Sequence, residues 1–281
     1  MENLVFLKLG GSLITDKLRP HTPRLKTLKD LASQIASARN ADPNLLLLLG
    51  HGSGSFGHVV AKKYKTREGL PPPFSSPIPK KTGRGQEGNY WRGFSEVWHE
   101  ADTLNQFVMS ALREANIPAM AMPPSSSVVA RDGQVATWNL DPIRSALSKE
   151  IVPVIYGDVI FDEVRGGTIL STEDLFMHLA REMRPQRILL AGIEEGVYAD
   201  FPARKQQVKR VTPGSFQEVR ASVGSSAGTD VTGGMQSKVQ QMVELVKSTS
   251  GLTIQIFSGL NSGNVQKALL GKELGTLIEP D

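Results

Sequence analysis

The sequence predicts an α/β protein with an open, mainly parallel β-sheet that helices cover on both faces. Short apolar runs such as Val5–Leu9 and Leu45–Leu49 end next to glycine, which is typical of buried strands that run into tight turns. Longer segments with apolar residues at helical spacing lie between these runs. Alternating strands and helices are the pattern of a parallel sheet in a three-layer αβα arrangement.

In the first half of the chain, each expected element rests on such a pattern. Thr27–Ala38 is a helix because Leu28, Leu31 and Ile35 recur at helical spacing. Pro71–Gly88 is rich in Pro, Ser, Gly and Lys, so we expect a mobile loop or insertion there. The expected elements, in order, are a strand at Val5–Leu9, the helix Thr27–Ala38, a strand at Leu45–Leu49, a helix near His58–Lys65, a helix at Trp91–Glu114 and a strand at Ile117–Met122.

In the second half, strands and helices continue to alternate. The β-branched run Ile151–Tyr156 stops at Gly157 and Asp158, which indicates a strand followed by a turn. The remaining elements are a helix at Glu173–Arg184, a strand at Arg187–Ala191, a helix at Val239–Thr249, a strand at Thr253–Ser258 and a short helix at Val265–Leu270.

Length and composition narrow the function classes. The 281 residues suffice for one large domain or two closely joined lobes, and the absence of cysteine excludes disulfides and thiolate metal sites. The chain has no run of eighteen apolar residues and its first residues lack a signal-peptide layout, so we expect a cytoplasmic protein that does not enter a membrane. The net charge of +4 suits anionic metabolites, and no nucleic-acid-binding motif accompanies it.

Three glycine turns follow strands of the predicted sheet. They are Lys8–Ser12, Gly50–His58 and Gly157-Asp158. Ligands of open parallel sheets bind beyond the carboxyl ends of the strands, so these turns are expected to share one site.

The second turn contains the pattern G-x-G-x-x-G at Gly52, Gly54 and Gly57. A dinucleotide site would need an acidic residue about twenty positions later, and a P-loop would need Lys-Ser or Lys-Thr after the last glycine; the chain has neither. What remains is a backbone cradle for a phosphate group. His58 follows this cradle and can hydrogen-bond a bound phosphate, whereas His51 is expected to be a cap or surface residue.

Cations lie beside the predicted turns. Lys8 ends a buried strand and Lys17 follows the first turn, so both can reach one anion, although a lysine that extends to the surface is the ordinary alternative for Lys8. Asp158 is placed to hold such lysines by ion pairing, or is an ordinary turn residue. Lys238 follows Gly233 and Gly234 and lies near a helix start, which indicates a second phosphate site.

Taken together, these motifs resemble the amino acid kinase superfamily. The resemblance rests on Lys8-Leu-Gly-Gly-Ser12, the Gly50–His58 turn, Gly157-Asp158, Gly196-Val-Tyr198 and Thr232-Gly-Gly-Met-x-x-Lys238, and it extends from about residue 4 to the C-terminus. It implies a single amino acid kinase domain over 1–281, with an acceptor-binding lobe at about 1–185 and a nucleotide-binding lobe at about 186–281.

Within that superfamily, Gly54-Ser-Phe-Gly-His58 resembles the isopentenyl phosphate kinases. These enzymes convert isopentenyl phosphate to isopentenyl diphosphate with MgATP, in an alternative mevalonate route of isoprenoid biosynthesis. The fosfomycin kinases, whose acceptor is a phosphonate, share the histidine and are the nearest alternative. A ligand-sensing domain without catalysis is a further alternative, against which the retained lysines argue.

The resemblance also implies residue roles. Lys8 and Lys17 would neutralise the transferring phosphoryl group, and Asp158 would organise the lysines. The acceptor phosphate would contact Ser53, Gly54, His58 and Gly157. The residues implied for ATP are Lys8, Gly10, Gly11, Ser12, Gly54, Gly192, Gly233, Gly234 and Lys238.

The resemblance implies partners as well. The Mg²⁺ ion would be held mainly by the nucleotide phosphates, with no metal site made by the protein alone, and the chain would form a homodimer. For the apolar tail of the acceptor, candidate lining residues are Phe94, Trp98, Phe107, Met109, Met120 and Met122.

Overall fold

The computed structural model describes residues 3–70, 86–218 and 234–281. Most of the predicted loop Pro71–Gly88 therefore lies outside the described residues, as does Gly233. Gln86–Gly88, which were expected to belong to that loop, instead form the first residues of a long helix.

The centre of the fold is an eight-stranded sheet, in which every paired neighbour is parallel except β13 and β14. Its strand order is β12 (Arg210–Val211), β14 (Thr276–Ile278), β13 (Thr253–Ser258), β9 (Arg187–Gly192), β1 (Leu4–Leu9), β2 (Leu46–His51), β6 (Val152–Tyr156) and β3 (Ala119–Ala121). The predicted open, mainly parallel sheet is confirmed. Strands before residue 185 form one half and later strands the other, and the halves meet where β1 pairs with β9.

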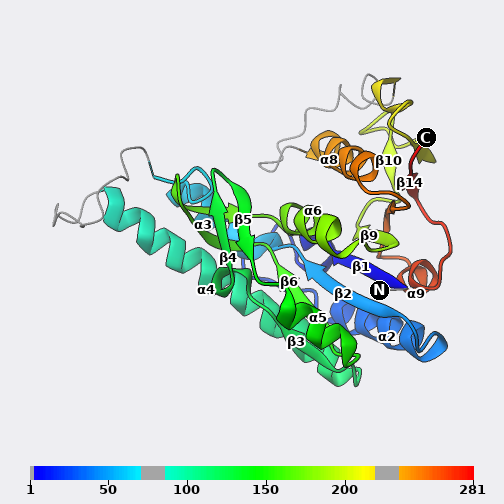
Figure 1. The fold of residues 1–281 in the computed structure, drawn as a ribbon, viewed down its shortest axis with the longest axis horizontal. Coiled ribbons are helices and arrows are strands. Elements are labelled where there is room, and N and C mark those ends of the chain that lie inside the picture. The colour runs from blue at the N-terminus through cyan, green and yellow to red at the C-terminus, as the bar shows by residue number, and fades with distance from the viewer. Residues whose placement is uncertain (1–2, 71–85, 219–233) are drawn as a thin grey trace.

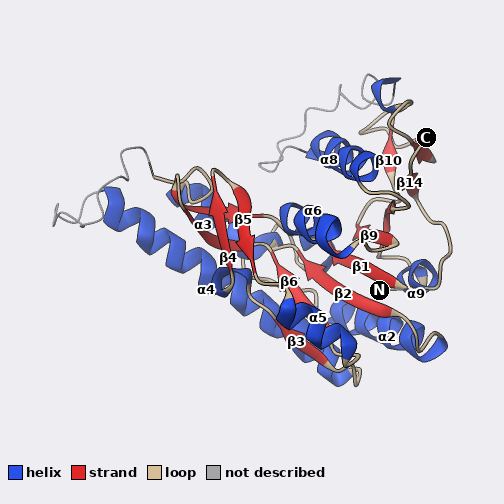
Figure 2. Cartoon of the chain, viewed as in Figure 1, coloured by secondary structure: helices blue, strands red, loops and turns tan. Residues whose placement is uncertain are grey.

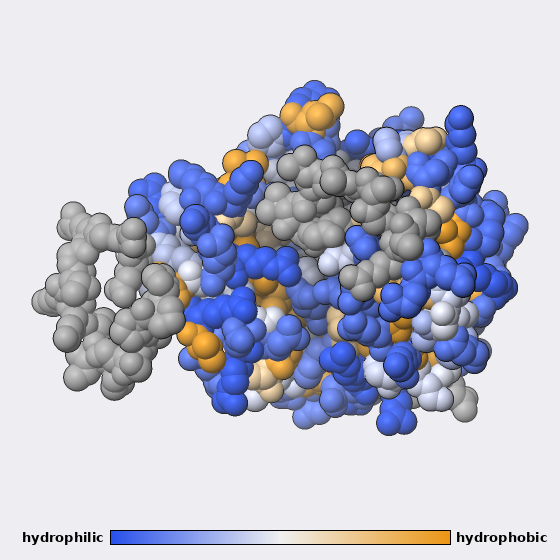
Figure 3. Space-filling view, turned by 90° about the horizontal axis from the view of Figure 1, so that it is seen from above, coloured by the Kyte–Doolittle hydropathy of each residue, from blue (hydrophilic) through white to orange (hydrophobic). Residues whose placement is uncertain are grey.

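Helices cover both faces of this sheet, which confirms the three-layer arrangement (Figures 1 and 2). One face packs against α5 (Asp141–Ser148), α6 (Thr172–Met183) and α8 (Gly234–Ser248). The other face packs against α2 (Leu25–Ala41), α4 (Gln86–Glu114) and α9 (Asn264–Leu269). Seen from above, the surface is mainly hydrophilic with separated hydrophobic spots, as expected when the apolar stripes face inward (Figure 3).

The alternation of side chains along β1 decides where its lysine points. Val5 and Leu7 belong to the core beside α2, whereas Leu4 and Phe6 belong to the core beside α6 and α8. Because successive strand residues face opposite sides of a sheet, Lys8 continues the series of Leu4 and Phe6. Its side chain therefore points to the face that α6 and α8 cover.

A second, four-stranded sheet was not predicted. Its order is β5 (Gln134–Trp138), β4 (Val128–Arg131), β7 (Asp158–Asp162) and β8 (Gly166–Leu170). Asp158 is the first residue of β7, so the expectation of a turn at this aspartate was wrong. The chain leaves one sheet at Tyr156 and enters the other after a single residue, Gly157.

Further elements belong to the described chain. They are α1 (Gly11–Ile14), α3 (Gly54–Tyr64), the 3₁₀-helix η1 (Pro124–Ser126), β10 (Val197–Tyr198) and β11 (Gln207–Val208). Helix α3 starts inside the predicted glycine turn, four residues before His58. Among the described helices, none combines the length and the apolar character that a bilayer span needs.

Candidate active site

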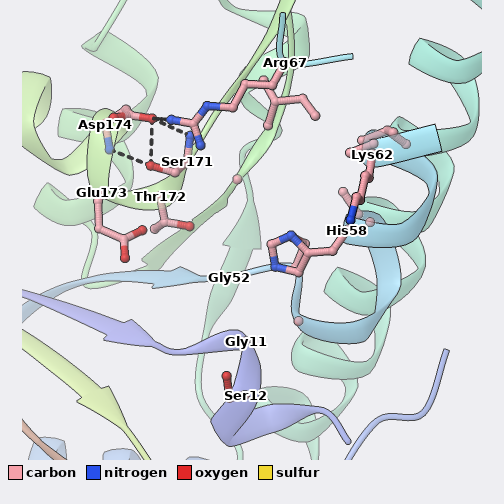
Figure 4. Close-up of a pocket in the computed structure, with 18 of the residues that line it drawn as sticks. Gly11, Ser12, Gly52, His58, Lys62, Arg67, Ser171, Thr172, Glu173 and Asp174 are labelled. Carbon is pink, nitrogen blue, oxygen red and sulfur yellow. Dashed lines mark hydrogen bonds and ion pairs between the residues drawn. The ribbon is translucent and has the colours of Figure 1, made fainter. Parts of the chain in front are cut away.

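A cavity of about 230 Å³ lies where β1, β2 and β6 end and where α3 and α6 begin. In Figure 4, Ser171 to Asp174 of α6 occupy one side, His58 and Lys62 of α3 face them, and Gly11 and Ser12 lie below. The sequence-predicted residues that line the cavity are Lys8, Gly11, Ser12, Lys17, Ser53, Gly54, His58, Gly157 and Lys238. The structure thus brings the three predicted turns to one place.

Other predicted residues lie apart from the cavity lining. Gly10 donates its N–H to Ala191 of the adjacent β9 at 2.8 Å, and Gly192 ends that strand. Asp158 is fully buried beneath the cavity wall. Gly234 is the first residue of α8.

Two glycine turns form the cavity floor by direct backbone contact. A Cβ atom on Gly11 would lie 2.3 Å from the nitrogen of Gly54, so no larger residue fits there without displacing the turn. Gly54 has a φ of +54°, and a Cβ on it would lie 2.1 Å from Thr15 Oγ1. Thr15 joins the turns, since its hydroxyl donates to the Gly11 carbonyl at 2.7 Å and accepts from the Ser55 N–H at 2.9 Å. The floor is therefore fixed backbone that can offer N–H groups to an anion.

Glu173 is the carboxylate that pairs with two of the cavity lysines, Lys8 and Lys238. Lys8 Nζ lies 3.0 Å from Glu173 Oε1, with both side chains about 10% exposed, and Lys238 Nζ lies 3.8 Å from the same oxygen. Burial would raise the pKa of Glu173, but Lys8 and Lys238 outweigh it and hold the pKa below its usual value. The carboxylate therefore stays ionised. It holds the ammonium group of Lys8, from the first half of the chain, and that of Lys238, from the second half.

The expectation that Asp158 organises the lysines is not what the structure shows. Its carboxylate accepts backbone N–H groups instead, from Ser125 at 3.0 Å and from Val159 at 2.8 Å. Burial raises the pKa of Asp158 to about 6, against the effect of these hydrogen bonds. Asp158 thus joins η1 to β7 below the cavity.

The helix predicted at Glu173–Arg184 is α6, but the sequence did not indicate that the start of this helix lines the site. Ser171 and Asp174 form a capping box, in which the Ser171 hydroxyl accepts from the Asp174 N–H at 3.1 Å and the Asp174 carboxylate accepts from the Ser171 N–H at 2.8 Å. Arg67 crosses the cavity mouth to Asp174, at 3.4 Å (Figure 4). A serine three residues before an aspartate, after an apolar strand, was the available signal for the capping box, and it would have moved the predicted helix start from Glu173 to Thr172.

The apolar wall of the cavity differs from the predicted one. None of the six aromatic and methionine candidates lines it. The wall consists of Val97 and Ala101, one turn apart on α4, with Ala61 of α3 and Ile169 of β8. Apolar residues at helical spacing identify the buried stripe of α4, but only the packing of α3 against α4 shows which part of the stripe borders a cavity.

His51 is buried rather than at the surface, so that expectation was wrong. It is 1% exposed, stacks on Tyr156 with ring centroids 5.1 Å apart, and its Nε2 lies 3.3 Å from Asn105 Oδ1 of α4. Its carbonyl accepts from the Thr172 hydroxyl at 2.6 Å. His51 thus joins the end of β2, just before the floor, to α4 and α6.

The burial of His51 predicts a specific pH dependence of stability. Burial lowers its pKa to about 4, so on acidification the unfolded chain takes up the imidazole proton first and the native state loses stability. Between pH 7.5 and pH 5 this loss amounts to about 2 kcal/mol, for an unfolded pKa of about 6.5. His51→Gln should therefore lose that much less than wild type over this range, measured by urea unfolding.

Taking the difference between variant and wild type cancels the opposite contribution of Asp158, whose raised pKa favours the native state on acidification. The exposed His99 of α4 offers a matched control, because His99→Gln should follow the wild type at both pH values. Equal losses for His51→Gln and wild type would contradict the prediction.

The comparisons with known proteins cover most of the chain. A model of the amino acid kinase family matches residues 3–258. The chain is 32% identical over 280 residues to the isopentenyl phosphate kinase of Methanocaldococcus jannaschii, covering 98% of each chain. It is 33% identical over 283 residues to that of Methanothermobacter thermautotrophicus, again covering 98% of each chain. X-ray structures of isopentenyl phosphate kinase superpose with a TM-score of 0.80 at 27% identity, over 98% of this chain and 99% of the other.

Proposed function

Because the chain belongs to the amino acid kinase family, we propose that it transfers the γ-phosphoryl group of ATP to isopentenyl phosphate, forming isopentenyl diphosphate and ADP. Full-length similarity to two isopentenyl phosphate kinases supports this acceptor. The observation that carries the proposal is the single cavity in which a backbone floor faces lysines from both halves of the sheet.

The reaction requires the protein to position the two substrates and to neutralise the charge of their phosphate groups. A phosphate oxygen of the acceptor is already an anionic nucleophile, so it attacks the γ-phosphorus without a base while the bond to ADP breaks. The N-terminal ends of α3 and α6 offer positive dipole ends to the phosphates. Lys8 and Lys17 would neutralise charge on the group in transfer, and Lys238 would contact the nucleotide phosphates.

The magnesium ion of the reaction would be held mainly by the nucleotide, because two carboxylates of the cavity already have partners. Among the described residues, three carboxylates line the cavity. Glu173 contacts Lys8, and Asp174 accepts from Ser171 and contacts Arg67, so these two are already engaged, while the third, Glu68, is exposed. The phosphate oxygens of ATP would therefore be the main ligands, and the ion would supply further charge neutralisation between the phosphates.

A coupled ADP-release assay with MgATP tests the acceptor. Isopentenyl phosphate and dimethylallyl phosphate should be turned over, whereas fosfomycin and acetylglutamate should not. Turnover of fosfomycin alone would mean that the acceptor is a phosphonate. If none of the four acceptors were turned over while calorimetry still showed binding of isopentenyl phosphate, the enzymatic proposal would be overturned and a ligand-sensing role favoured.

His58 provides the next prediction. It lies in the first turns of α3 and lines the cavity opposite α6 (Figure 4), where it would hydrogen-bond the acceptor phosphate. His58→Ala should raise the acceptor KM by roughly tenfold, which is the value of one charge-assisted hydrogen bond. The KM for ATP should change less than twofold, and His99→Ala should change neither. An unchanged acceptor KM would refute the role.

We also propose that the chain forms a homodimer. Trp98 on α4 and Met120 on the edge strand β3 are 42% and 50% exposed, and large apolar side chains on neighbouring elements suit a contact with a second copy. Light scattering that gave the mass of one chain at micromolar concentration would contradict this proposal.

A further inference from the structure

The loop that carries Lys17 spans the gap between α1 and α2, and it is closed on itself. A bridge pairs Thr15 with Pro23, and the Asp16 N–H donates to the Thr22 carbonyl at 2.9 Å. Lys17 lies near the tip, and its neighbour Leu18 is 92% exposed. These internal contacts give the loop a shape but do not set the position of its tip over the cavity.

The side chain of His21 connects this loop to α4. His21 Nδ1 lies 2.6 Å from Glu100 Oε2, and the Glu100 side chain is only 16% exposed. The His21 ring also packs edge-on against Phe56 of α3, with centroids 5.8 Å apart, and the backbone N–H of His21 donates to the Ser55 carbonyl at 3.4 Å. The loop is thus attached to α4 through His21. It is attached to the first turn of α3 through His21 and also through Thr22, whose N–H donates to the Ser55 hydroxyl at 3.5 Å.

The place of attachment connects the loop to the cavity wall. Glu100 directly precedes Ala101 and lies less than one turn after Val97, and both of these residues line the apolar wall. Ser55 and Phe56 lie between the floor glycine Gly54 and His58. His21 is therefore held by the same two helix segments that form the proposed acceptor side of the site.

We propose that His21 and Glu100 are positioning residues that hold Lys17 in place for phosphoryl transfer. The inference rests on the proposed kinase activity. A lysine on an exposed loop has many conformations, and a displacement of about 1 Å can cost roughly a hundredfold in rate. The hydrogen bond at 2.6 Å restricts the loop to the position in which Lys17 borders the cavity. Loss of the bond should lower kcat and leave the acceptor KM nearly unchanged, because neither residue lines the cavity.

The first variant is His21→Asn. His21 has a φ of +52°, and asparagine tolerates this left-handed conformation while its shorter side chain cannot reach Glu100. The second variant, Glu100→Ala, removes the other partner. Both should lower kcat about fivefold with the acceptor KM within twofold of wild type, and the double variant should be no slower than either single variant. His99→Ala, next to Glu100 and exposed, is the control and should match the wild type.

Two further measurements separate this role from a merely structural one. In a Lys17→Ala background, His21→Asn should have no additional effect on kcat, because the pair acts through Lys17. A further fivefold loss in that background, or single variants with wild-type kcat, would overturn the proposal.

Limited trypsin digestion gives a readout that needs no activity. Cleavage between Lys17 and Leu18 in the folded protein should become several-fold faster in His21→Asn and Glu100→Ala, and stay unchanged in His99→Ala. Unchanged cleavage rates in the first two variants would refute the attachment even if the wild type proved inactive on every acceptor, so failure of this inference and failure of the proposed function are distinguishable.

Discussion

Replacing Lys8 with methionine should lower kcat at least about a hundredfold and should also destabilise the fold. The loss of a charge that acts on the transferring phosphoryl group is worth about 3 kcal/mol or more in the barrier. The same change leaves Lys238, at 3.8 Å, as the remaining ion-pair partner of the buried Glu173 among the described residues. Removing one partner of a buried ion pair costs roughly 3 kcal/mol of unfolding free energy. Steady-state kinetics and urea unfolding measure the two effects separately.

The double variant Lys8→Met/Glu173→Met separates catalysis from stability. It removes both buried charges, and apolar side chains of similar length can fill the space, so most of the stability should return. The turnover should not return, because the cation is still missing. Recovery of activity together with stability would mean that Lys8 serves only to hold Glu173.

Lys17→Ala should depress kcat at least about tenfold while leaving stability unchanged. Lys17 is exposed at the cavity edge, and it forms no ion pair with any of the described residues. Its removal therefore leaves no buried charge without a partner. A lost charge contact in the transition state is worth more than about 1.4 kcal/mol, which corresponds to the tenfold effect.

The exposed Lys26 on α2 offers a matched control, since Lys26→Ala removes the same charge away from the cavity. A decrease in kcat for Lys17→Ala that is matched by Lys26→Ala would indicate a general effect of net charge. A decrease smaller than tenfold would mean that the transition-state charge lies on another residue.

Much of the central sheet could be predicted because its signals are local. Buried parallel strands are continuous apolar runs, and glycine marks their ends, so β1, β2, β6, β9 and β13 were recognisable without tertiary information. The second sheet also had a local signal that went unused, namely Asp132-Gly133 between two alternating segments, which is typical of a hairpin.

The candidate site was predictable to the extent that its residues follow strand ends. The turns converge because parallel strands end at one edge of the sheet, and Lys8 faces α6 because of strand alternation. The partner of Lys8 was not predictable in this way. Asp158 and Glu173 are both acidic residues after strands, and which carboxylate reaches the lysine depends on how α6 packs on the sheet. The position of Arg67 depends in the same way on how the segment after α3 contacts β8, where the Thr168 hydroxyl donates to the Arg67 carbonyl.

The contact between Gly11 and Gly54 has a consequence for how acceptors are distinguished. These two glycines have no side chain to exchange, and a Cβ added to Gly11 would lie 2.3 Å from the nitrogen of Gly54, which leaves no room for one. Such a surface accepts a tetrahedral anion whatever is attached to it. In the proposed kinase, discrimination among phosphorylated compounds would therefore depend on the apolar wall around Val97 and Ala101. A designer who wished to change the acceptor could vary this apolar wall and leave the glycine floor and His58 untouched.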